Sequence, residues 1–252
     1  MKYPGLILAA TLAANTAIAD TELTMAQSDG GDDASTTVIS VQKGKVAFSE
    51  DGIVQSIYDS ANGAFTQIDH AGKGYMVMDS ESMGQMADQV SDMVKQFEAQ
   101  MANMPPEQRE AMMKMIPADM RAKLSGSAPK KTVSVEWTGD SDKVAGYKCK
   151  IASVTLPDGD RSTACVAKAD ALGIPGSDYD AMAAMLETMQ ELASRFGVAP
   201  DMPSAKQMGG VPIRMTGSEQ AMELQSVSTD ELSSAIFEVP AGYRKRSMLD
   251  GM

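Results

Sequence analysis

The sequence predicts an α+β protein with one antiparallel sheet and two or three methionine-rich amphipathic helices. Short β-prone runs separated by turn dipeptides predict the sheet. Methionines that recur at alternating steps of three and four residues predict the helices. Because nothing repeats at a fixed period, we expect one domain over residues 20–252.

The N-terminus has the features of a cleavable secretory signal over residues 1–19. Lys2 supplies the positive charge, residues 5–14 form a short apolar run, and Ala17-Ile18-Ala19 is a small-x-small cleavage site. The run is shorter than the roughly 20 apolar residues that a membrane span requires, and no later stretch exceeds it. We therefore expect cleavage after Ala19, a periplasmic protein and no transmembrane anchor.

Composition narrows the possible partners. The chain has a formal net charge of −12, which argues against nucleic acid and anionic lipid headgroups, since both attract clustered Lys and Arg. The basic cluster Arg244-Lys245-Arg246 is interpreted as a solvated end.

The sequence from Thr21 to about Asp79 is rich in short β-prone runs and predicts an antiparallel meander. Turn signals such as Asp51-Gly52 and Asn62-Gly63 separate its runs. Strands resume with the alternation around Trp137 and continue through GYKCKIASVTL and RSTACVAK. After the last helix, GGVPIRM and MELQSVS predict two further strands, and FEVPAGY predicts an extended end.

Helical periodicity occupies residues 80–124 and 177–197. Each segment places large apolar side chains on one face, and we treat this face as a candidate surface for an apolar ligand. Its residues are Met83, Met86, Val90, Met93, Phe97, Met101, Met182, Leu186 and Met189.

Two cysteines, Cys149 and Cys165, predict a disulfide in an oxidising compartment. A two-residue turn at Asp158-Gly159 would place Cys165 opposite Ala152, too far from Cys149 for a bond. The disulfide therefore requires a bulge, a longer loop or another register.

The chain contains 22 methionines, which allow three interpretations. The methionines could fill a core with flexible side chains, react with oxidants as a sacrificial buffer, or bind copper(I) through their thioether sulfurs. The copper alternative would use Met112, Met113 and Met115. No cofactor is predicted.

Catalytic motifs are missing from the sequence. The chain has one histidine, His70, and no serine lies in the GxSxG motif that a catalytic serine–histidine pair would need. Phosphate-binding loops and the HExxH zinc motif are also absent. We therefore expect a protein that is not an enzyme.

Several motifs resemble a family of exported bacterial proteins, the domain of unknown function 4412. They are MPPEQRE, GYKCKI, LPDG, ACVA, LGIP, GGVPIRM and FEVPAGYRK. The resemblance implies a curved half-barrel wrapped around helices, similar to periplasmic lipoprotein carriers, and no catalytic residues. The resulting hypothesis is a non-catalytic envelope protein that binds an apolar or lipid-like molecule. The alternatives are a copper(I) or oxidant buffer and a structural partner of another envelope protein.

Overall fold

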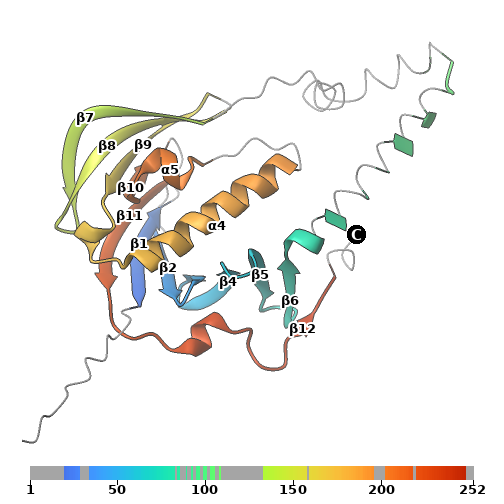
Figure 1. Ribbon diagram of the computed structural model, residues 1–252, viewed down its shortest axis with the longest axis horizontal. Coiled ribbons are helices and arrows are strands. Elements are labelled where there is room, and N and C mark those ends of the chain that lie inside the picture. The colour runs from blue at the N-terminus through green and yellow to red at the C-terminus, as the bar shows by residue number, and fades with distance from the viewer. Residues whose placement is uncertain are drawn as a thin grey trace, which may run out of the picture.

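The computed structural model describes residues 20–28, 34–82, 133–157, 159–195, 202–217 and 220–247, with scattered positions from 84 to 108. Within these residues, twelve strands form one sheet in the order β12-β6-β5-β4-β3-β2-β1-β11-β10-β9-β8-β7. All neighbours are antiparallel except β12 and β6, which are parallel. The predicted α+β class and curved, unclosed antiparallel sheet are confirmed (Figure 1).

The elements follow the sequence closely. The strands of the first half are β1 (Thr21–Ser28), β2 (Ala34–Gln42), β3 (Lys45–Glu50), β4 (Ile53–Asp59), β5 (Ala64–Asp69) and β6 (Gly74–Met78). The strands of the second half are β7 (Ser134–Val144), β8 (Tyr147–Thr155), β9 (Arg161–Ala167), β10 (Val211–Thr216), β11 (Ala221–Ser228) and β12 (Arg244–Lys245). The helices whose full bounds lie within the described residues are η1 (Asp170–Leu172), α4 (Gly176–Arg195), α5 (Ala205–Met208) and η2 (Ser234–Phe237).

Two-residue turns fix the register of three hairpins. Lys43-Gly44, Asp51-Gly52 and Ala145-Gly146 each place both residues at positive φ, as a type I′ turn requires. The strand residues that flank these turns pair directly with each other. Because side chains alternate along a strand, this register directs every second residue to the same face.

Strand β1 joins the two halves of the sheet. It pairs with β2 on one side and with β11 on the other. Its residues Leu23 and Met25 are buried on the same face as Val41 and Val46 of the meander. The first strand of the predicted mature chain is therefore a central strand.

Helix α4 covers the concave face of the sheet and contacts β2 and β3 (Figure 1). Tyr58 of β4 lies in this core, and its hydroxyl is 3.0 Å from Oγ1 of Thr188 on the helix. Since that Thr188 hydroxyl donates to the carbonyl of Ala184, Tyr58 is the donor. The polar end of a buried aromatic side chain is thereby satisfied.

The methionine stripe of this helix is only partly buried. Met182 is buried and packs in the main core with half-buried Leu186, as the periodicity predicts. Met185, which the predicted stripe omits, is also buried, whereas Met189 is 43% exposed. Met189 therefore lies on a part of the predicted apolar face that is not packed, since the buried residues Met182 and Met185 lie nearer the start of the helix. The predictions at Met83, Met86, Val90, Met93, Phe97 and Met101 lie outside the described residues.

The convex face carries a separate core near β3 to β5. Ala47, Ile57 and Ile68 pack there against Phe237 of the C-terminal segment. Nε2 of His70 lies 2.6 Å from the carbonyl oxygen of Val54, and Nδ1 lies 2.9 Å from the hydroxyl of Tyr243. Because a carbonyl only accepts, Nε2 carries the proton. His70 thus connects the meander to the end of FEVPAGY.

The basic C-terminal cluster is exposed, as the sequence predicts, but it is held at the edge of the sheet. Arg244 and Lys245 form the parallel strand beside β6, and Arg246 makes an ion pair with Asp69 at 2.9 Å. The Arg246 side chain occupies the space where a Cβ on Gly74 would lie, at 2.4 Å. The absence of a side chain at Gly74 therefore lets Arg246 pack against β6 and holds the C-terminal segment there.

Substitutions in α4 test its role in the core. We expect Met182→Ala to lower the free energy of unfolding by about 2 to 4 kcal/mol, because it leaves a cavity, and Met182→Leu to cost less than about 1.5 kcal/mol. Met189→Ala, on the exposed part of the same helix, is the matched control and should change stability by less than about 0.5 kcal/mol. Urea denaturation measures all three. Equal losses for the two alanine variants would contradict this assignment.

Candidate functional site

An open groove of about 780 Å³ lies at the β7 end of the sheet. Strands β8 and β9 form its floor, a bulged part of β7 forms one wall, and α5 with Gly209 forms the other. Trp137 stands on the β7 wall and is 47% exposed. The buried side chains of Val166 and Met208 lie beneath. This volume is within the range of small-molecule sites, about 300 to 1,000 Å³.

The wall formed by α5 is held by specific contacts. Ser204 caps the helix in a capping box with Gln207. The same Gln207 donates through Nε2 to the carbonyl of Val133 at 3.1 Å, just before β7. At the other end, Nζ of Lys168 donates to the carbonyl of Gly209 at 3.0 Å. The two walls are therefore connected directly.

Gly210 follows this wall and permits its close approach to β9. A Cβ at this position would lie 2.3 Å from the carbonyl oxygen of Ala167. No real Cβ makes such a contact, so any larger residue would move the start of β10 away from β9. Close packing of β10 against β9 therefore explains why the second glycine of the pair before VPIRM has no side chain.

The groove has a positive lining in an acidic protein. Its lining includes four lysines and one carboxylate, Asp140, whereas the whole chain has a formal net charge of −12. The lysines are Lys148, Lys150, Lys168 and Lys206. Within the described residues, none of the four is within ion-pair distance of a carboxylate. Clustered cations beside an exposed aromatic ring suit an anion that also has an apolar part.

The disulfide lies on the opposite face of the same strands. Cys149 and Cys165 are joined, with Cα atoms 5.3 Å apart. The hairpin pairs Thr155 with Arg161, so its loop is longer than two residues, and Cys165 faces Ile151. Cys149 is thus the diagonal neighbour of Cys165 on one face. The predicted disulfide is confirmed, and the longer loop is what allows it.

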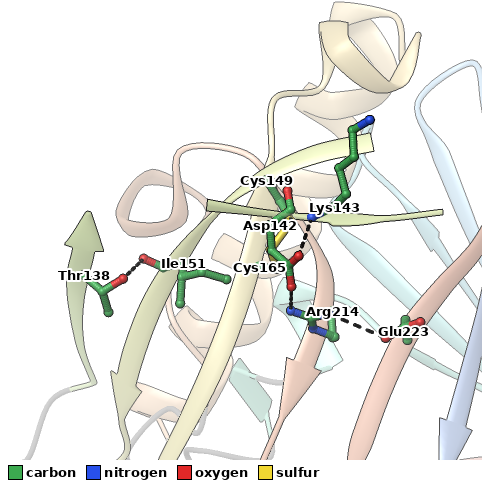
Figure 2. The surroundings of a disulfide bond; sticks show 8 residues. All are labelled: Thr138, Asp142, Lys143, Cys149, Ile151, Cys165, Arg214 and Glu223. Carbon is green, nitrogen blue, oxygen red and sulfur yellow. Dashed lines mark hydrogen bonds and ion pairs between the residues drawn. A yellow bond between two sulfur atoms is a disulfide. The ribbon is translucent and has the colours of Figure 1, made fainter. Parts of the chain in front are cut away.

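An ion-pair network crosses the strands that carry the disulfide (Figure 2). Asp142 of β7 pairs in register with Cys149, and Arg214 of β10 pairs with Cys165. The Arg214 guanidinium donates to Asp142 and lies 3.9 Å from the Glu223 carboxylate. The hydrogen bond from Arg214 is the main reason that the pKa of Asp142 lies below its ordinary value. This network links β7, β10 and β11.

The family model for the domain of unknown function DUF4412 matches residues 70–243, most of the chain. The chain belongs to this family. The matched span begins at His70 and ends at Tyr243, the two residues that are hydrogen-bonded across the convex face. No curated protein matches the sequence.

Solved structures share a general likeness with this DUF4412 protein at low sequence identity. An uncharacterised conserved protein from Thermus thermophilus is 6% identical, with 90% of each chain covered and a TM-score of 0.44. PNGF-II is 10% identical, with 92% of this chain and 32% of that chain covered and a TM-score of 0.43. MucB is 11% identical, with 90% and 59% covered and a TM-score of 0.37. The chain thus spans about a third of PNGF-II, and these likenesses carry no argument about activity.

The site residues that the sequence predicts lie in different parts of the chain. Cys149 and Cys165 meet, and Met182 and Leu186 of the candidate ligand surface pack in the main core of the DUF4412 fold. The copper candidates Met112, Met113 and Met115 lie outside the described residues. Among the described residues, no three His, Cys, Asp or Glu side chains gather as a metal site. No described helix has the length and apolar character needed to cross a membrane.

Sequence reasoning missed the groove. The sequence Lys148-Cys149-Lys150 carries a signal, because a strand that buries Cys149 directs both lysines to the other face. The remaining lysines come from the end of β9 and from α5, and only folding brings them to this place. Overall acidity therefore gave a poor guide to the local charge.

Loss of the disulfide should weaken this end of the sheet. We expect the Cys149→Ala/Cys165→Ala variant to lose about 3 kcal/mol of unfolding free energy, since the bond closes a loop with a sequence separation of 16. Intact mass should show the wild-type protein two hydrogens lighter than its reduced form. Reduced wild-type protein serves as the matched control and should unfold like the variant. Alkylation of both thiols without reduction would contradict the bond.

Proposed function

We propose that this DUF4412 protein is a non-catalytic binding protein of the bacterial envelope, and that its ligand is lipid-like, with an anionic group and an apolar part. The observation that carries the proposal is the groove, where Trp137 and four lysines meet in an otherwise acidic chain. Ligand sites of this size combine apolar surface with a few polar or charged groups that orient the ligand.

Charge supports an anion over a neutral ligand. Lys150 and Lys206 stand on the floor strand and on α5, so they line the groove from two sides. Both side chains are exposed, and among the described residues of the lining Asp140 is the one carboxylate. An anion between them gains from both cations without the cost of burying an unpaired charge.

The contacts of His70 and the cysteines support a role without catalysis and a location outside the cytosol. Both ring nitrogens of His70 are engaged by Val54 and Tyr243, so the ring is used to hold the C-terminal segment. Both cysteines are in the disulfide, a bond that persists in oxidising compartments. The signal-like residues 1–19 support the same location.

Trp137 is the only tryptophan of the chain and reports on the groove directly. We expect an anionic brominated fatty acid to quench its fluorescence with saturation below the micelle concentration. Because two cations are lost, Lys150→Gln/Lys206→Gln should raise the Kd about tenfold, which corresponds to about 1.4 kcal/mol. Fluorescence titration at fixed ionic strength measures this change.

Lys245→Gln is the matched control, because Lys245 is an exposed lysine on β12 at the opposite end of the sheet. It should leave the Kd unchanged. A neutral alkyl maltoside and inorganic phosphate, used separately, distinguish the apolar and anionic contributions, and both should bind more weakly than the fatty acid. Absence of saturable quenching, or an equal effect of both lysine variants, would refute the proposal.

A further inference from the structure

Two carboxylates are buried where the first strand meets the start of α4. Asp178, in the first turn of the helix, is 2% exposed, and Asp20, just before β1, is 3% exposed. Thr21, the first residue of β1, is fully buried, and its Oγ1 donates a hydrogen bond to Oδ2 of Asp178 at 2.7 Å. The start of the expected mature chain is therefore packed directly against the helix.

The hydrogen-bond partners of these carboxylates in the described part of the chain are uncharged. Asp178 also accepts from the Ser177 hydroxyl at 3.4 Å. Asp20 accepts from Nε2 of Gln42 at 2.7 Å and from the backbone N–H of Leu232 at 2.8 Å. Within the described residues, no lysine or arginine is within ion-pair distance of either group.

This arrangement is costly without a cation. Desolvation raises the pKa of Asp178, and the nearby charge of Asp20 also raises it. The N-terminus of α4 favours a carboxylate by only about 0.3 to 2 kcal/mol, whereas an uncompensated buried charge costs several kcal/mol. A positive group close to both carboxylates would remove this cost.

We infer that the compensating cation is the α-ammonium group of Asp20, which forms when the leader is removed. A leader peptidase hydrolyses the peptide bond between Ala19 and Asp20, leaving a carboxylate on Ala19 and an ammonium group on Asp20. Asp20 directly precedes Thr21, whose side chain bonds to Asp178, so its backbone nitrogen is one residue away from that buried contact. The new ammonium pairs with the Asp178 carboxylate.

The consequence is that processing stabilises the fold. Before cleavage, the nitrogen of Asp20 is an uncharged amide, and the Asp20 and Asp178 carboxylates are both buried. After cleavage, the same atom supplies one positive charge between β1 and α4. The inference rests on Asp178 and its neighbours and does not depend on any ligand.

A double-mutant cycle tests the ion pair. One exported chain has the native junction and begins at Asp20, and the second carries one glycine inserted between Ala19 and Asp20, which moves the ammonium away. Asp178→Asn is made in both, because asparagine still accepts the Thr21 hydrogen bond. Intact mass verifies each N-terminus, and thermal melting gives stability.

We expect the effect of Asp178→Asn to change sign between the two chains. In the native chain it should lower the Tm by roughly 5 °C or more, since it leaves a buried ammonium without its partner. In the glycine-extended chain it should leave the Tm unchanged or raise it, since it removes an unpaired carboxylate. Asp180→Asn, at an exposed position of the same helix, should have the same small effect in both chains.

Two outcomes would overturn the inference. One is an equal change in Tm for Asp178→Asn in the native and extended chains, which would show that the ammonium does not interact with this carboxylate. The other is an exported chain that begins at a residue other than Asp20. A failure of lipid-like ligands to bind the groove would leave this result unaffected, so the two proposals are tested separately.

Discussion

Burial of the concave face against one helix is the constraint on which the described structure depends. A curved sheet leaves apolar side chains of many strands on its inner side, and α4 is the element that covers those of β2 and β3. The helix supplies Met182 and Met185, whose unbranched side chains fill irregular space between strands that diverge. Tyr58 adds a directional hydrogen bond to Thr188, which fixes the position of the helix along the sheet.

The two faces of the sheet carry different side chains at the β7 end, and strand periodicity is the cause. In Lys148-Cys149-Lys150, Cys149 points into the core and forms the disulfide, while the lysines point to the groove. A change of register by one residue would bury two ammonium groups and expose the thiols. The five-residue loop 156–160 between the paired residues Thr155 and Arg161 therefore sets both the covalent bond and the charge of the groove.

The sequence predicted the features that depend on local pattern. Alternating apolar residues and turn signals predicted the strands, and Asp51-Gly52 forms the expected turn. Local pattern did not distinguish the buried part of α4 from the exposed part, because Met182 and Met189 share one helical face and only the extent of the sheet separates them. The groove was missed for a related reason. Lys168 and Lys206 are far apart in sequence, and the hydrogen bond from Lys168 to Gly209 closes that distance.

The groove wall is an edge strand, and this explains why so many contacts meet there. An edge strand has one row of unpaired backbone groups and frays or pairs with other chains unless it is modified. Between Trp137 and Ser141 the register of β7 shifts, with Gly139 at a φ of +88°. Such a bulge twists the edge and re-aims its side chains. On the far side of the bulge, the hydrogen bond from Arg214 to Asp142 connects β7 to β10 across β8 and β9. The bulge is therefore held by strand pairing on one side and by this hydrogen bond on the other, which keeps Trp137 on the groove wall.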